Sequence, residues 1–168
     1  MSKNNWIYFK FKINMSKVKV VTIGLGYIGL PTSALIAQNG IQVHGVDVNQ
    51  HVVDTINQGK IHIVEPSLDI AVEEAVRKGF LQADLKPVEA ETYLIVVPTP
   101  FKGNHEPDIS YLESATRNIL PFLKEGDLYI IESTSPIGTT EKMMNLIYGE
   151  RPELKGKLNI AYCPERVL

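Results

Sequence analysis

A glycine pattern near the start of the chain has the spacing of a phosphate-binding turn. Gly24, Gly26 and Gly29 form a G-x-G-x-x-G sequence that follows an apolar run and opens a helical pattern. In that setting the first glycine permits a tight turn, the second lets the backbone approach a pyrophosphate, and the third allows close packing of helix on strand. The free N–H groups of the helix start would hold the phosphates. The alternative is a glycine turn that binds nothing.

An acidic residue lies at the end of the next predicted strand. Asp47 is placed to accept hydrogen bonds from the hydroxyls of an adenosine ribose. Its carboxylate would repel a 2′-phosphate, and the three residues that follow it include no arginine to receive one. The pattern therefore favours NAD over NADP as the cofactor.

Hydroxyl side chains follow two later strands. Thr99 lies in the segment 97–100, and Ser133, Thr134 and Ser135 lie in the segment 132–136. Open α/β sheets bind ligands at the carboxyl ends of their strands, which places these hydroxyls beside the expected nicotinamide. Taken alone they are equally consistent with turn and capping residues, and the same two readings apply to Thr139 and Thr140.

Short apolar runs alternate with helical patterns along the whole chain. This alternation predicts parallel βαβ units in a doubly wound parallel sheet, a Rossmann-type α/β domain. Ser110 and Glu113 match a capping box at the start of one helix, and Pro121 is expected to kink its end. The expected strands are 18–23, 41–48, 80–83, 93–97, 128–131 and 158–162, and the expected helices are 28–38, 50–58, 67–78, 110–124 and 138–147.

Composition restricts the class of protein. A chain of 168 residues with 44% hydrophobic residues can form one compact domain with a core. The 17 basic and 19 acidic residues are nearly balanced, which argues against a nucleic-acid partner. No apolar run is long enough to span a membrane. One cysteine fits a reducing, cytoplasmic setting, and the four scattered histidines predict no metal site.

The first residues are expected to lie outside this domain. Ile7, Phe9, Phe11 and Ile13 alternate with polar residues, and Met15 directly precedes the first regular element. We expect Met15 to be the natural start, residues 1–14 to be a leader that takes no part in the fold, and residues 15–168 to form the NAD-binding domain. An added edge strand in residues 1–14 is the alternative.

The ordered motifs resemble one family of dehydrogenases. The segments that carry the resemblance are GLGYIGLP, VDVN, VPTPF, ESTSPIGTTE and CPERVL, and the similarity covers residues 17–168. They look like the NAD-binding half of the UDP-glucose/GDP-mannose dehydrogenase family. VDTINQGKIHIVEP and VPTPFKGNHEPDISYLESA are most similar to its UDP-N-acetyl-D-mannosamine branch. Hydroxyacid and 6-phosphogluconate-type dehydrogenases share the glycine motif, but they do not predict the later segments.

The resemblance implies a four-electron oxidation. The C6 hydroxyl of a UDP-sugar becomes a carboxylate in two hydride transfers to NAD⁺, through a thioester on a cysteine that water hydrolyses. For this branch the substrate is UDP-N-acetyl-D-mannosamine, the product serves surface polysaccharide synthesis, and the complete enzyme is a homodimer.

The resemblance also assigns roles to positions of this sequence. Its cofactor-binding positions are Gly24, Gly26, Tyr27, Ile28, Gly29, Asp47, Thr99 and Thr140. Glu165 matches a glutamate that helps to activate water, aided by the position of Thr134, while Arg166 and Val167 match positions that touch the UDP-sugar. The nucleophilic cysteine and the lysine of the family belong to a substrate domain that has no counterpart in these residues.

The only cysteine of the chain is not expected to be the nucleophile. Related enzymes carry Asn or Ser at the position of Cys163, and no histidine is near it in sequence to activate a thiolate. A buried structural cysteine is expected instead. Two functions follow for these residues: the cofactor half of a nucleotide-sugar dehydrogenase, inactive alone, or a stand-alone NAD-binding or interaction module without turnover. The coding DNA beyond Leu168 distinguishes them.

Overall fold

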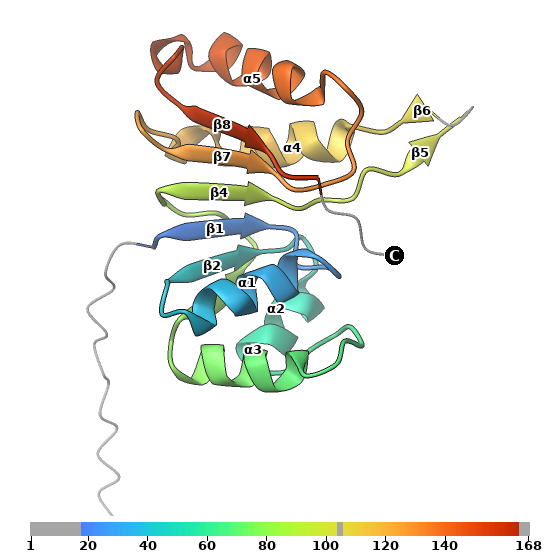
Figure 1. The fold of residues 1–168 in the computed structure, drawn as a ribbon, viewed down its shortest axis with the longest axis vertical. Helices are drawn as coiled ribbons and strands as arrows, with labels where there is room; N and C mark the ends of the chain where they lie inside the picture. The colour runs from blue at the N-terminus through green and yellow to red at the C-terminus, as the bar shows by residue number, and fades with distance from the viewer. Residues whose placement is uncertain (1–17, 104–105, 165–168) are drawn as a thin grey trace, which may run out of the picture.

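A six-stranded parallel sheet forms the centre of the protein (Figure 1). A computed structural model describes residues 18–103 and 106–164. The strands lie in the order β3-β2-β1-β4-β7-β8, and each neighbouring pair is parallel. From β1 the chain first adds strands on one side of the sheet and then, from β4 onward, on the other side. The boundary between β1 and β4 is therefore the switch point of a doubly wound sheet, as predicted. The strands are β1 (Val20–Ile23), β2 (Val43–Val46), β3 (Leu81–Asp84), β4 (Thr92–Ile95), β7 (Leu128–Ile131) and β8 (Asn159–Tyr162).

Five α-helices connect these strands. Every predicted helix is present, with ends that lie within five residues of the prediction. The helices are α1 (Gly29–Gln38), α2 (Gln50–Asn57), α3 (Leu68–Arg77), α4 (Ser110–Ile119) and α5 (Thr139–Glu150). None of the helices in the described part of the chain is long and apolar enough to cross a membrane.

Two hydrophobic cores lie on opposite faces of the sheet. Side chains alternate along a strand, so Val20 of β1 joins one core while Val21 and Ile23 join the other. The first core packs under α1, α2 and α3 and consists of aliphatic residues and alanine. The second packs under α4 and α5 and includes two tyrosines, Tyr93 and Tyr129.

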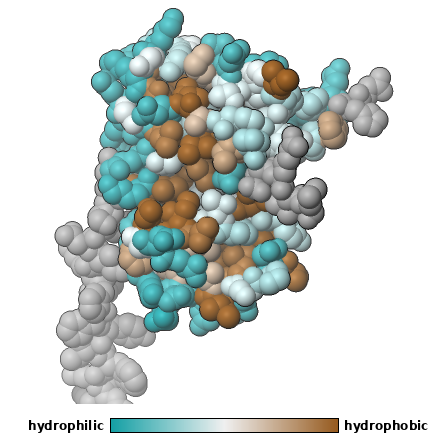
Figure 2. Space-filling view, in the orientation of Figure 1, coloured by the Kyte–Doolittle hydropathy of each residue, from teal (hydrophilic) through white to brown (hydrophobic). Residues whose placement is uncertain are grey.

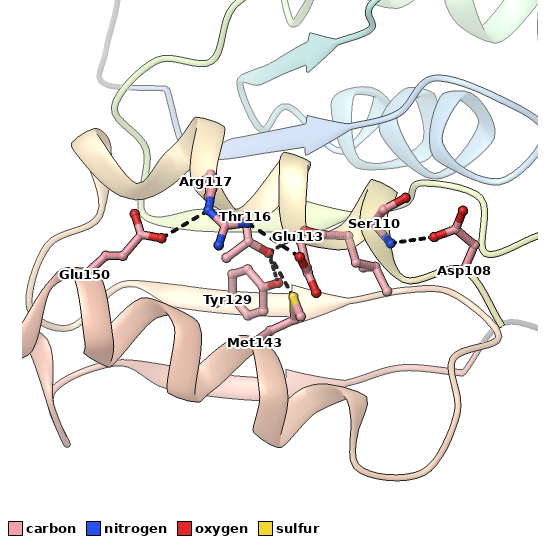
Figure 3. A network of polar contacts seen from close by, with 9 residues as sticks. Asp108, Ser110, Glu113, Thr116, Arg117, Tyr129, Met143 and Glu150 are labelled. Atoms are coloured by element: carbon pink, nitrogen blue, oxygen red, sulfur yellow. Dashed lines mark hydrogen bonds and ion pairs between the residues drawn. The ribbon is translucent and has the colours of Figure 1, made fainter. Parts of the chain in front are cut away.

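The two buried tyrosines are hydrogen-bonded inside the second core. The Tyr129 hydroxyl lies 2.7 Å from Thr116 Oγ1 of α4, beside Met143 of α5 (Figure 3). The Tyr93 hydroxyl accepts the Ala90 N–H at 3.0 Å. Burial raises the pKa of each phenol to about 12. Both tyrosines therefore stay neutral at any physiological pH.

The N-terminus of α4 is not capped as predicted. Ser110 lies inside the helix, so the expected capping box with Glu113 is wrong. The Asp108 carboxylate instead accepts the Ser110 N–H at 3.0 Å (Figure 3). Hydrogen bonds from Ser110 and then from Lys102 lower the pKa of Asp108 to about 2. A carboxylate two residues earlier thus competes successfully for the free N–H groups of the first turn.

Two further features differ from the prediction. α4 ends at Ile119 and continues only as a 3-10 turn, Leu120–Phe122, because Pro121 cannot extend the helix. A short antiparallel pair, β5 (Phe101–Lys102) and β6 (Glu106–Pro107), projects from the carboxyl edge of the sheet (Figure 1). The expected leader, residues 1–14, lies outside the described residues.

One face of the sheet is covered incompletely. Leu128 and Ile130 alternate with the buried Tyr129 and Ile131, and they are only half-buried and belong to neither core. Figure 2 shows apolar residues gathered in the middle of this view, where β4 and β7 run above α1. Apolar side chains of β7 are therefore partly exposed on this face of the sheet.

Candidate cofactor-binding site

The glycine turn has the geometry that its three glycines predict. Gly24 has a φ of +98°, and a side chain there would place its Cβ 2.5 Å from the carbonyl oxygen of Val96. At Gly29 a Cβ would lie 1.9 Å from the carbonyl oxygen of Gly24, so only glycine fits where α1 leaves the sheet. At Gly26 a Cβ would meet no atom within 4 Å. The open space is thus at the position where a pyrophosphate must approach the backbone.

Asp47 is fixed beside this turn. Its Oδ2 accepts the N–H of Leu25 at 3.1 Å, and its Oδ1 accepts the N–H of Asn49 at 2.9 Å. Leu25 is fully buried against Gly45 of β2, where a Cβ would come within 2.8 Å of the leucine side chain. The end of β2 and the glycine turn therefore hold each other, and Asp47 directly follows the last residue of β2.

Two hollows share Gly26 in their linings, and together they form the crevice. One, of about 350 Å³, runs from Gly24 and Gly26 to Asp47 and is walled by Val48, Leu85 and Tyr111. The other, of about 470 Å³, runs from Gly26 to a wall of residues that follow β4 and β7. Because the sequence predicts that Asp47 accepts the adenosine ribose, the second hollow is where the nicotinamide half is expected. Its lining residues include Tyr27, Ile28, Val97, Thr99, Glu132, Ser133 and Thr134.

The wall of the second hollow is built from side-chain hydroxyls. Thr99 donates its hydroxyl hydrogen to the carbonyl oxygen of Thr134 at 3.0 Å. The hydroxyl oxygens of Ser133 and Ser135 lie 2.6 Å apart. Thr99, Ser133 and Thr134 therefore line the second hollow as well as taking part in turns, whereas Ser135 lines neither hollow.

The remaining predicted site residues are placed differently. Thr140 lies half-buried in the first turn of α5 and is absent from the linings of both hollows. Cys163 is exposed, so the expected burial is wrong. It follows the last residue of β8, and only its backbone N–H remains in the ladder, bonded to the Ile131 carbonyl at 2.9 Å. The predictions for Glu165, Arg166 and Val167 lie outside the described residues.

Sequence reasoning missed two groups of lining residues. Val48, Leu85 and Tyr111 come from three separate segments and share no sequence motif. They stand out only in the structure, as large apolar side chains that are exposed. Glu132 is buried in the second hollow and accepts a long hydrogen bond, 3.5 Å, from the Thr32 hydroxyl of α1. The sequence alone does not indicate that Glu132 is buried in the site, because its hydrogen-bond partner, Thr32, lies 100 residues away in the chain.

Comparison with known families identifies the domain type. The model of the UDP-glucose/GDP-mannose dehydrogenase family, NAD binding domain, matches residues 18–168. The UDP-N-acetyl-D-mannosamine dehydrogenase of Escherichia coli (strain K12) is 58% identical over 162 residues, which cover 92% of this chain and 39% of that protein. The NDP-N-acetyl-D-galactosaminuronic acid dehydrogenase of Ralstonia nicotianae is 51% identical over 157 residues, 89% of this chain and 37% of that protein.

A solved structure agrees with these relatives. The native structure of the UDP-N-acetyl-mannosamine dehydrogenase Cap5O from Staphylococcus aureus matches with a TM-score of 0.80 at 37% identity. The match covers 89% of this chain and 37% of that chain. The chain thus spans about two fifths of the length of the curated relatives that it matches.

Proposed function

The chain belongs to the UDP-glucose/GDP-mannose dehydrogenase family, and on that premise we propose that it is the NAD-binding part of a nucleotide-sugar 6-dehydrogenase. The proposed substrate is UDP-N-acetyl-D-mannosamine, the sugar nucleotide in the names of the E. coli and S. aureus relatives. Its C6 hydroxyl is oxidised to a carboxylate, with one water consumed, two hydrides passed to two NAD⁺ and three protons released. The product would be UDP-N-acetyl-D-mannosaminuronate, for surface polysaccharide synthesis.

The crevice on either side of Gly26 is the observation that supports this proposal most strongly. A dinucleotide needs a phosphate site in the middle, a ribose acceptor on one side and room on the other. Gly26 has open space above its Cα, Asp47 lies at one end, and the wall near Thr134 lies at the other. The residues present therefore fit NAD, which would accept the hydride when bound.

Each proposed contact has a stated physical task. Tyr27 and Ile28 line the second hollow at the start of α1, and their backbone N–H groups would bind the phosphates. Gly24 and Gly29 shape the turn, and Asp47 would accept the ribose hydroxyls. Thr99 and Thr140 are proposed as further cofactor contacts. Thr134 lines the hollow on the substrate side and is proposed to support catalysis together with Glu165, with Arg166 and Val167 contacting the UDP-sugar.

Calorimetric titration of the 168-residue chain tests the cofactor proposal. NAD⁺ should bind and NADP⁺ should bind more weakly, because Asp47 would repel a 2′-phosphate. Asp47→Ala should weaken NAD⁺ binding roughly tenfold to a hundredfold, the loss expected for hydrogen bonds to a charged group. Asp54→Ala is the matched control, because it removes an exposed carboxylate of α2 that accepts a hydrogen bond from the Gln50 side chain.

The outcomes of this titration are distinct. A folded wild-type chain that binds neither nucleotide would contradict the proposal. Equal weakening by Asp47→Ala and Asp54→Ala would show that general charge, and not the ribose acceptor, explains the affinity.

Turnover is a separate test. We expect no sustained NADH formation when the 168-residue chain is mixed with NAD⁺ and UDP-N-acetyl-D-mannosamine. Cys163 is the only cysteine of these residues, and it matches a position that does not require a thiol. Steady NADH production from the chain by itself would refute this expectation.

A further inference from the structure

The turn 133–135 lies between the crevice and the last strand of the sheet. Glu132 makes the final ladder bond on this side, donating its N–H to the carbonyl oxygen of Ile95 at 2.9 Å. Beyond it the backbone leaves β7, and the Ser135 N–H bonds within the turn to the Ser133 carbonyl at 3.0 Å. Thr134, at the tip, lines the second hollow. The position of the hollow's wall therefore depends on what holds this turn.

Two hydroxyls from neighbouring segments hold the turn from opposite sides. Thr99, after β4, donates to the Thr134 carbonyl. Tyr162, the last residue of β8, accepts the Ser135 N–H at 3.3 Å and donates to the Ser135 carbonyl at 3.4 Å. The phenol thus uses its donor and an acceptor lone pair on one residue of the turn. Tyr162 is the register partner of Ile131 in the neighbouring strand, which brings its ring alongside the turn.

We propose that Tyr162 is a positioning residue for the nicotinamide half of the cofactor site, because its hydroxyl fixes the turn 133–135 that walls the second hollow. The proposal rests on the proposed NAD function. The ring is 43% exposed and belongs to neither hydrophobic core. Burial therefore gives little reason for a large side chain here, whereas the two bonds of the hydroxyl both end on Ser135.

Tyr162→Phe tests the inference, because it removes the hydroxyl and keeps the ring. NAD⁺ and ADP are titrated into wild type and variant, since ADP carries the adenosine half and lacks the nicotinamide. We expect the dissociation constant for NAD⁺ to rise roughly threefold to tenfold, the effect of losing one or two partly exposed hydrogen bonds. The dissociation constant for ADP should not change.

Tyr148→Phe is the matched control for this experiment. Tyr148 lies half-buried on α5, and its hydroxyl makes no hydrogen bond to the described residues. This variant should bind both ligands as wild type does.

Three results would overturn the inference. They are an unchanged NAD⁺ affinity in Tyr162→Phe, an equal loss for NAD⁺ and ADP, and the same loss of NAD⁺ affinity in Tyr148→Phe. An equal loss would show that Tyr162 supports the whole domain and not one wall of the crevice. If the wild-type chain does not bind NAD⁺ at all, the proposed function fails first, and the two failures are thereby distinguished.

Discussion

The two halves of the crevice are built by different means. The half proposed for the phosphates and the adenosine consists of one short backbone turn, 24–29, and a single carboxylate, Asp47. The half proposed for the nicotinamide is assembled from the ends of three strands, through Thr99, the turn 133–135 and Tyr162. The geometry of the first half is determined by steric exclusion, because any side chain at Gly24 or Gly29 would clash with the backbone. The second depends on hydrogen bonds, each of which contributes about 1 kcal/mol.

The two hydrophobic cores also differ from each other. The buried residues of the core under α1, α2 and α3 are aliphatic, and they stabilise the protein through packing. The core under α4 and α5 buries the hydroxyls of Tyr93, Thr116 and Tyr129. Those hydroxyls must stay protonated and paired, because an unpaired or charged group is costly in a buried site. The core under α1, α2 and α3 is therefore specified by the shapes of its side chains, whereas the core under α4 and α5 also depends on hydrogen bonds.

A methyl group added to the glycine turn tests the first half most severely. Gly29→Ala should destabilise the protein by about 3 kcal/mol or more, because its Cβ would lie 1.9 Å from the Gly24 carbonyl oxygen and backbone must move. Gly26→Ala is the control: it meets no atom within 4 Å, so stability should hold while NAD⁺ affinity falls. Urea unfolding and titration measure the two effects. Equal stability of the two variants would contradict the claim that steric exclusion determines the geometry of the glycine turn.

Alkaline pH should act on the second core. Burial raises the pKa of Tyr93 and Tyr129 to about 12, above the value near 10 of an unfolded tyrosine. The stability that this shift contributes is fully present below pH 10 and is lost as the pH rises towards 12. We expect a loss of about 1 kcal/mol per tyrosine at the middle of this interval, measured by urea unfolding. Tyr129→Phe should show a smaller loss, and an unaltered pH dependence in that variant would contradict the assignment.

The smallest effect is expected for the second support of the turn 133–135. Thr99→Val removes the bond to the Thr134 carbonyl and keeps the shape of the side chain. The dissociation constant for NAD⁺ should rise roughly twofold to tenfold, with stability almost unchanged. Thr99→Ser retains the hydroxyl and should restore most of the affinity. A serine variant as weak as the valine variant would mean that the methyl group, and not the bond, is what matters.

Local patterns predicted most of the fold and the first half of the site. The alternation of strands and helices gave every element of the main sheet, because each element is specified by its own apolar periodicity. The roles of Gly24, Gly26 and Gly29 in the turn were also readable, since conformation and spacing within six residues determine them. The capping of α4 was predicted wrongly because Asp108 and Ser110 both carry a side-chain oxygen that can accept an N–H of the first turn. The sequence does not show which of the two accepts it.

The sequence by itself therefore determined the fold, the phosphate turn and the acidic residue beside it, because short-range sterics and periodicity govern all three. Only the tertiary structure decided how Thr99, Ser135 and Tyr162 meet, how Thr32 reaches Glu132, and that Cys163 is exposed. These contacts join residues that are 27 to 100 positions apart and depend on the register of β4, β7 and β8. Register and strand order arise from packing of the whole sheet, and no local pattern encodes them.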